Sequence, residues 1–226
     1  METEVACQSP VQRMVRGPVQ LRSVAVLFAR ADSYYKELPG CEVYDIARDA
    51  RTYDGPWPVV AHPPCRAWGR LRSFANPRPD ERNLARLAVA LVREFGGVLE
   101  HPAGSQLWPA QGLPELGGDI DCFGGWTTGI HQWQFGHRAE KATWLYIVGC
   151  SPSELPDWPD LKLGEASHVI QTRKRSDYRP HVSKAEREIT PPKLATWLVD
   201  LARRVCMPDN AELTGMPKAS QSWMQG

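Results

Sequence analysis

Short continuous runs of apolar residues, separated by polar and proline-rich segments, recur along the first two thirds of the chain. Such runs are typical of strands buried on both faces of a parallel sheet, because neither face of the strand meets water. A weaker run predicts a strand over 130–135, and the Gly, Pro and Trp residues of 103–130 predict loops. The stronger runs predict strands over residues 23–29, 41–46, 59–61, 98–102 and 143–149.

Two segments show the spacing of an amphipathic helix. The first follows Asp80, a residue type that caps helix N-termini, and stops at the Gly-Gly pair 96–97. The second begins at the Thr-Pro-Pro of 190–192. Their apolar positions are Leu84, Leu87, Ala88, Leu91 and Phe95, and then Leu194, Trp197, Leu198 and Leu201. Strands alternating with helices predict an α/β fold with a Rossmann-like, mainly parallel sheet, flanking helices and long Trp/Pro/Gly-rich loops.

Length and composition narrow the class of protein. The 226 residues suit a single domain, which we expect over 21–206, with tails over 1–20 and 207–226. A net charge of +1 argues against a generally basic surface, although 173–181 forms a local basic patch that could track phosphates. The six cysteines include no Cys-x-x-Cys pair, so no zinc site is indicated. Without a signal peptide or an apolar run of membrane length, we expect a cytoplasmic protein with free thiols and no membrane partner.

The segment 59–65, Val-Val-Ala-His-Pro-Pro-Cys, carries the clearest chemical signal. Proline can neither donate to a sheet ladder nor continue a helix, so the chain must leave the strand just before Cys65. In open α/β sheets, ligands bind at this carboxyl end of the strands. Arg66 and His62 beside the thiol favour a lowered pKa, which would make Cys65 a nucleophile. The alternative is a buried cysteine after a kinked strand.

Glu100 ends the next predicted strand. The strand, helix and strand from Cys65 to Glu100 form a βαβ unit, whose parallel geometry brings both residues to the same edge of the sheet. Taken alone, Glu100 is more simply a strand-end carboxylate that caps a nearby group. Together with Cys65 it predicts a catalytic pair.

The order of these motifs resembles the C5 family of DNA cytosine methyltransferases. In that family a Pro-Pro-Cys loop carries the nucleophile, a glutamate at a strand end contacts the pyrimidine ring, and a later arginine-rich strand edge completes the pocket. Residues 63–65 match the first motif, and 100–102 is similar to the second, with His101 in place of asparagine. Residues 134–149 are similar to the third, and the likeness covers about residues 23–150.

The resemblance implies that Cys65 adds to C6 of a pyrimidine, which makes C5 able to attack an electrophilic carbon. Glu100, held protonated beside N3, would take up charge from the ring. Arg138 and Lys141 would complete the catalytic set, although each alone reads as part of a solvated loop. The substrate would be DNA or a pyrimidine nucleotide, and the implied substrate-binding residues are Pro64, Arg66, Trp68 and His101.

The resemblance also implies S-adenosyl-L-methionine as the methyl donor, beside Phe28, Ser33, Asp45 and Ile46. Two features of the family are absent. No glycine occurs at 27–33, where the family has its glycine-rich cofactor loop. After the strand ending at 149, only about 40 residues precede the last helix, too few for a separate target-recognition domain. The sequence therefore resembles a reduced form of the family, of a size that suits a phage-encoded enzyme in its host's cytoplasm.

Two other functions remain open on the residues alone. The absent glycine loop also suits a catalytically lapsed nucleic-acid or nucleotide binding protein of the same fold. A thiol hydrolase would pair Cys65 with His62 or His101.

Overall fold

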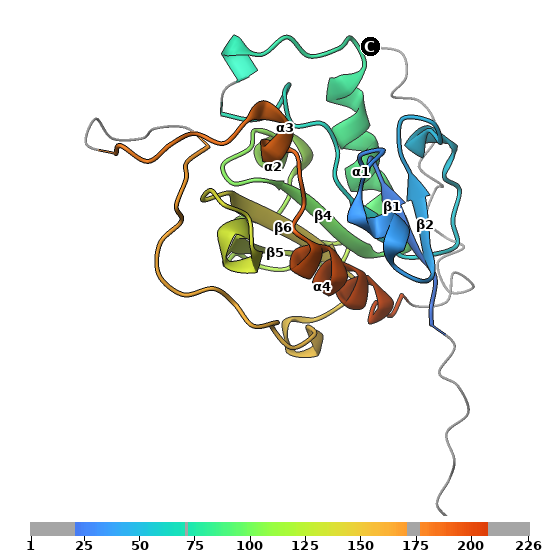
Figure 1. Ribbon diagram of the computed structural model, residues 1–226. Coiled ribbons are helices and arrows are strands. Elements are labelled where there is room, and N and C mark those ends of the chain that lie inside the picture. Colours follow the sequence, from blue (N-terminus) through green and yellow to red (C-terminus); the bar gives the residue numbers. More distant parts are fainter. Residues whose placement is uncertain (1–20, 71, 171–176, 208–226) are drawn as a thin grey trace, which may run out of the picture.

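The described part of the chain forms one six-stranded sheet. The structure is a computed structural model, and it describes residues 21–70, 72–170 and 177–207 (Figure 1). The order across the sheet is β2-β1-β3-β4-β6-β5. The strands are β1 (Val24–Leu27), β2 (Cys41–Tyr44), β3 (Val59–Ala61), β4 (Gly97–Pro102), β5 (Gly125–His131) and β6 (Ala142–Val148). The tails over 1–20 and 208–226, and residues 173–176 of the predicted basic patch, lie outside the described residues.

The first four strands pair in parallel, whereas both pairings of β6 are antiparallel. β1 pairs in parallel with β2 and β3, and β3 pairs in parallel with β4. β6 runs antiparallel to both β4 and β5. Since β5 and β6 are consecutive, a short connection with the 3₁₀-helix η4 (Gln132–Phe135) is enough to join them. The α/β class is confirmed, but the expected mainly parallel sheet is a mixed one.

Five of the six predicted strands are confirmed. β1, β3, β4 and β6 lie inside the sheet as largely apolar runs, whereas β2 contains Glu42 and lies at an edge. The strand predicted over 130–135 is wrong in position. β5 ends at His131 and begins at Gly125, inside the segment predicted as loops. β5 is an edge strand whose exposure varies from residue to residue, so it shows no continuous apolar run.

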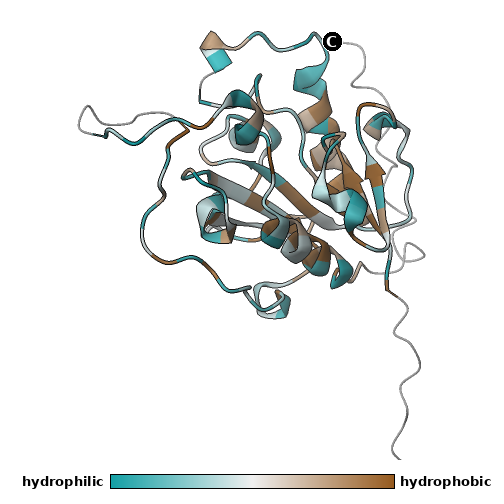
Figure 2. Cartoon of the chain, viewed as in Figure 1, coloured by the Kyte–Doolittle hydropathy of each residue, from teal (hydrophilic) through white to brown (hydrophobic). Residues whose placement is uncertain are grey.

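Two helices cover the two faces of the sheet, α1 (Glu81–Phe95) on one and α4 (Pro192–Arg203) on the other (Figure 1). Both were predicted. In Figure 2 the strands between them are largely hydrophobic. Ala88 of α1 belongs to the same buried cluster as Leu99, and Leu198 of α4 belongs to the same buried cluster as Val98. Successive residues of β4 therefore point to opposite faces of the sheet.

The remaining elements are short. Asp80 stands at the N-cap position of α1, but its side chain makes no capping hydrogen bond and lies 3.8 Å from Arg51 instead. Among the described residues, no helix is both long and apolar enough to cross a membrane. The short elements are α2 (Leu107–Gln111), α3 (Lys184–Arg187), η1 (Tyr34–Glu37), η2 (Ala50–Thr52), η3 (Arg72–Phe74) and η5 (Pro152–Glu154).

Candidate active site

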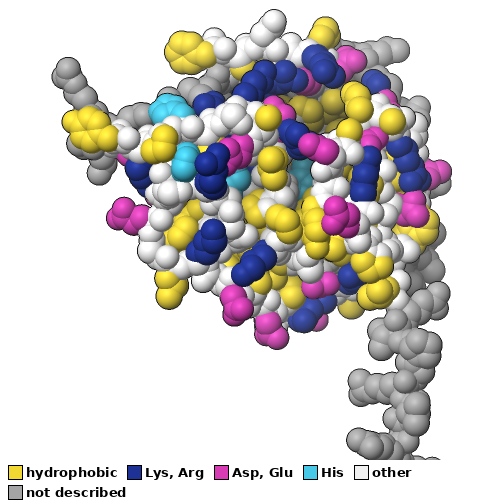
Figure 3. All heavy atoms as spheres, viewed as in Figure 1, with side chains coloured by type: hydrophobic (Ala, Val, Ile, Leu, Met, Phe, Trp, Pro, Cys, Tyr) yellow, Lys and Arg dark blue, Asp and Glu magenta, His cyan; other side chains and the backbone are white. Residues whose placement is uncertain are grey.

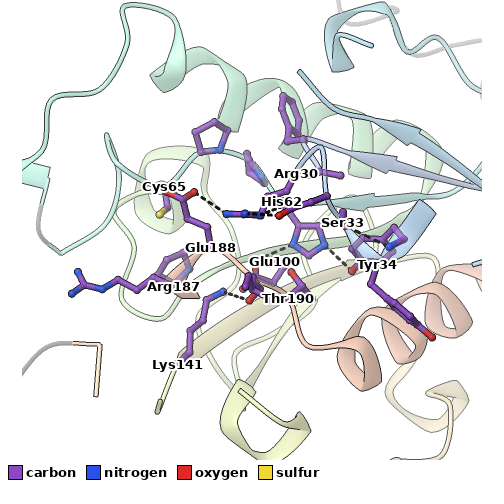
Figure 4. A pocket seen from close by; sticks show the side chains of 18 of the residues that line it. Arg30, Ser33, Tyr34, His62, Cys65, Glu100, Lys141, Arg187, Glu188 and Thr190 are labelled. Atoms are coloured by element: carbon purple, nitrogen blue, oxygen red, sulfur yellow. Dashed lines mark hydrogen bonds and ion pairs between the residues drawn. The ribbon is translucent and has the colours of Figure 1, made fainter. Parts of the chain in front are cut away.

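Cys65 and Glu100 line one cavity of about 390 Å³ at the carboxyl ends of β1, β3 and β4 (Figure 4). Parallel pairing of β3 with β4 places these two strand ends side by side, as the βαβ argument required. Lys141, just before β6, and Glu188, just after α3, also line it. The cavity thus gathers a thiol, carboxylates and a cation from segments far apart in the sequence.

The Cys65 thiol is exposed to this cavity rather than buried after a kinked strand. Its pKa is raised, first because the surrounding protein atoms desolvate the thiolate, and second because the Glu100 carboxylate is negative. Lys141 opposes this rise with a smaller effect. The expected lowering of the pKa by Arg66 is wrong, because the Arg66 guanidinium pairs with Glu81 instead. In the resting site Cys65 is therefore a thiol.

Glu100 is almost fully buried, and both its oxygens accept hydrogen bonds. His62 Nδ1 lies 3.1 Å from Oε2, and Gln132 Nε2 donates to Oε1 over 2.6 Å. Burial alone would raise the pKa of Glu100, but the His62 hydrogen bond and the field of Lys141 outweigh it and lower the pKa to about 2. The expectation that Glu100 is held protonated is therefore wrong for the free protein, because the neighbouring donors favour the carboxylate.

The loops after β1 and α3 supply residues that the sequence reasoning missed. Arg30 pairs with Asp32 at 2.8 Å and reaches Glu188 at 3.4 Å across the cavity. Lys141 Nζ donates to the carbonyl of Ile189 over 3.3 Å. Arg30 follows a strand that ends at the same sheet edge as Cys65, so its position was a signal available in the sequence. No signal in the sequence indicated that residues 187–192 would approach this cavity.

A second cavity of about 510 Å³ adjoins the first and shares Phe28, Ala29 and Pro64 with it. Two of the residues implied for cofactor binding, Asp45 and Ile46, line this second cavity.

Of the other implied cofactor residues, Ser33 lines the first cavity and Phe28 lines both. Phe28 has φ = +61°, a left-handed conformation that residues other than glycine seldom adopt. Local strain of this kind is often found at functional sites. Phe28 therefore stands at the junction of the two cavities, at the strand end where the family has its glycine loop.

Three residues of the implied site lie elsewhere. Trp68 is buried in the core against α1, where its indole donates to the carbonyl of Arg82 over 3.1 Å. Arg138 is drawn away from the cavity by its ion pair with Glu186 at 2.5 Å. His101 is fully buried, packs near Trp108, and points to the opposite face of the sheet from Glu100. The implied substrate-binding roles of Trp68 and His101 and the implied catalytic role of Arg138 are therefore not supported. His101 also cannot serve Cys65 as a base.

The buried His101 makes stability depend on pH. Burial lowers its pKa to about 4, and neither ring nitrogen has a partner among the described residues. The unfolded chain binds a proton at His101 near pH 6.5 and the folded chain does not, so stability should fall as the pH drops from 6.5 to 4. His101→Leu should remove roughly 3 kcal/mol of this decline, measured by urea unfolding across that window. His131→Leu, at an exposed histidine, should leave the decline in place; equal effects would contradict the assignment.

The two charges that flank Cys65 should shift its pKa in opposite directions. Glu100→Gln should lower the pKa of the thiol and Lys141→Met should raise it, because these groups respectively oppose and favour the thiolate. The measurement is the pH dependence of iodoacetamide alkylation, followed on the Cys65 peptide by mass spectrometry. The exposed Cys122, in the same digest, serves as the internal control. Shifts of the same sign in both variants would contradict this electrostatic description.

Comparisons with known proteins give no assignment: no family model, no curated protein and no solved structure matches the chain. Within the described residues, no group of three or more His, Cys, Asp or Glu side chains is arranged to hold a metal ion.

Proposed function

We propose that the protein modifies a pyrimidine base at C5 through a covalent adduct between Cys65 and C6. The observation that carries this proposal is that Cys65 and Glu100, from neighbouring parallel strands, line one cavity. A thiolate added to C6 turns C5 into an enamine carbon that can attack an electrophile, and a carboxyl group beside the ring can exchange a proton with it. The parallel part of the sheet, β1 to β4, with cavities at its carboxyl ends, supports a Rossmann-like, methyltransferase-like fold.

The second cavity is the proposed place for the group donor, with S-adenosyl-L-methionine as the first candidate. Asp45, Asp49, Asp80 and Glu81 line it together with Arg51 and Arg78, so it offers carboxylates to a donor's sulfonium and amino group and guanidinium groups to its carboxylate. Pro64 and Phe28 belong to both cavities, which would put the donor's reactive carbon next to the ring.

Covalent trapping tests the function directly. A 5-fluorocytosine or 5-fluorouracil oligonucleotide is incubated with the protein and a donor, because fluorine at C5 blocks the elimination that would release the cysteine. The expected product is a protein–oligonucleotide adduct that peptide mapping places on Cys65. If no adduct on Cys65 forms with oligonucleotide or nucleotide under any donor condition, the proposal fails.

The loop between β3 and α1 favours a polynucleotide over a free nucleotide. Residues 66–80 contain four arginines and one aspartate. Lys and Arg side chains gather along the upper rim of the molecule in Figure 3, over this loop. Arg70, Arg72 and Arg78 are exposed and, within the described residues, their side chains have no hydrogen-bond or ion-pair partner. Phe74 on the same loop is 88% exposed, an aromatic surface on which a base can stack.

Charge reversal on this loop should weaken binding of an oligonucleotide. Arg70→Glu combined with Arg72→Glu should lower affinity about tenfold or more and reduce the slope of log affinity against log salt by about 2, because each phosphate contact contributes about 0.9. Fluorescence anisotropy at several salt concentrations measures both quantities. Lys162→Glu combined with Lys193→Glu, at two exposed lysines outside this loop, is the charge-matched control. Equal losses in the two variants would point to net charge rather than to this loop.

The second candidate function is a catalytically lapsed binder of nucleic acid or nucleotides. The observation that favours it is Phe28, a side chain where the family's cofactor loop has glycine. Cys65→Ala would leave such a protein's function intact, and no donor would occupy the second cavity.

A further inference from the structure

A chain of hydrogen bonds runs through the buried wall of the Cys65 cavity. Tyr35 Oη, from η1, lies 2.8 Å from His62 Nε2, and His62 Nδ1 lies 3.1 Å from Glu100 Oε2. Gln132 Nε2 continues the chain from Glu100 to Thr143 Oγ1, over 2.6 Å and 3.1 Å. Figure 4 shows the His62 ring directed toward Glu100, which lies below it in the cavity.

These bonds fix the tautomer of His62. An ionised Glu100 only accepts, so the proton of a neutral His62 ring is on Nδ1. Nε2 is then an acceptor, and the Tyr35 hydroxyl donates a hydrogen bond to it. Tyr35 stays protonated, because burial and the Glu100 charge raise its pKa. His62 can accept one more proton at Nε2, provided that the Tyr35 hydroxyl turns and accepts from it.

The proton inventory of the site requires such an acceptor. The resting site contains a Cys65 thiol and a Glu100 carboxylate. For the thiol to become a nucleophile, its proton must leave. The adduct in turn needs a proton on the ring, so a carrier that can both take and return one proton would serve both halves of the step.

We propose that His62 is the proton-carrying partner of Glu100 in the Cys65 reaction. This inference rests on the proposed function. With cytosine, the S–H proton passes to the Glu100–His62 pair as the sulfur bonds to C6. The C5=C6 π electrons form a C4=C5 bond, the C4=N3 π electrons move to N3, and the pair returns the proton to N3. No proton is gained or lost overall, and the stored proton sits on an imidazolium beside a carboxylate.

The charged and titratable groups that face this pair come from every element around the cavity. A pH–rate profile of the reaction will reflect all of them. The test therefore compares the rates of variants and wild type and does not assign one limb of the profile to one residue. These groups are Arg30, Asp32, Tyr34, Tyr35, Cys65, Arg66, Lys141, Arg187 and Glu188.

The test is exchange of the C5 hydrogen of cytosine with deuterium from solvent, which needs the adduct but no donor. His62→Asn keeps an N–H that can donate to Glu100 but cannot carry a proton, whereas His62→Ala removes both functions. Both should slow exchange about 10²-fold or more across the pH range, at oligonucleotide affinities within about threefold of the wild type. His131→Asn, at an exposed histidine outside the cavity lining, should exchange at the wild-type rate.

The outcomes separate this inference from the function on which it rests. If the wild type neither exchanges C5 hydrogen nor forms the fluoropyrimidine adduct, the proposed function is wrong. If the wild type exchanges and His62→Asn stays within about threefold of it, the histidine is only structural and the inference is overturned. Tyr35→Phe serves if the His62 variants do not fold. It removes the hydroxyl that must accept from protonated Nε2 and should slow exchange about tenfold; an unchanged rate would overturn the inference equally.

Discussion

Serine in place of Cys65 should lower the rate of C5 hydrogen exchange at least about 10⁴-fold, which is effectively abolition. A hydroxyl is a much weaker acid than a thiol, so the Glu100–His62 pair would take its proton far less readily. The raised pKa of the Cys65 thiol indicates that the site already disfavours an anion at this position. Exchange is measured by mass spectrometry of the oligonucleotide in deuterated buffer, which makes the result independent of the donor.

The control for Cys65→Ser is Cys122→Ser, because Cys122 is also a free and exposed cysteine. It should exchange at the wild-type rate. Cys65→Ser itself should fold normally, since the side chain is exposed and the substitution changes one atom. A folded Cys65→Ser protein that still exchanges C5 hydrogen would contradict covalent catalysis at this residue, and one that only binds would favour the lapsed binder.

The fold and the centre of the site were predictable where the signal is local. Largely apolar runs identified β1, β3, β4 and β6, since buried strands need apolar residues on both faces. The strand–helix–strand order then fixed the relative position of Cys65 and Glu100, because parallel neighbours end at the same edge.

The errors have physical causes of two kinds. His101 was wrongly assigned to the site because it follows Glu100 in a strand, and successive strand residues point to opposite faces. This error could have been avoided from the sequence alone. Arg138 and Tyr35 depend on partners distant in the chain, Glu186 and His62, which no local pattern reveals. The ionised state of Glu100 could not be predicted for the same reason, because its pKa is set by donors that only folding brings together.

The resting charges also affect how the site would work. A thiol beside a carboxylate carries one negative charge, as a thiolate beside a carboxylic acid does, so moving the proton leaves the net charge of the pair unchanged. The cavity need not stabilise an extra anion to activate the nucleophile; it needs a path for one proton. The hydrogen-bonded chain Glu100–His62–Tyr35 in the cavity wall would provide such a path.

Alanine at Gly97 should destabilise the protein by at least about 4 kcal/mol, a large part of a typical domain's stability, and leave little folded protein at 37 °C. Gly97 begins β4 with φ = +125°, and a Cβ there would lie 2.0 Å from the carbonyl oxygen and 2.6 Å from the amide nitrogen of Val59. β3 cannot move aside, because it is held between β1 and β4. Any shift of β4 would also move Glu100 relative to Cys65. Urea unfolding followed by circular dichroism measures the loss.

Gly136→Ala separates steric clash from backbone strain. Gly136 has a similar φ of +113°, but a Cβ there would meet nothing within 4 Å. It should therefore cost only about 1–2 kcal/mol, the strain of a left-handed alanine. The difference between the two variants measures how closely β3 and β4 approach at Val59. If both variants lost the same stability, the close approach of the strands would not determine the cost, and the need for glycine at 97 would be conformational alone.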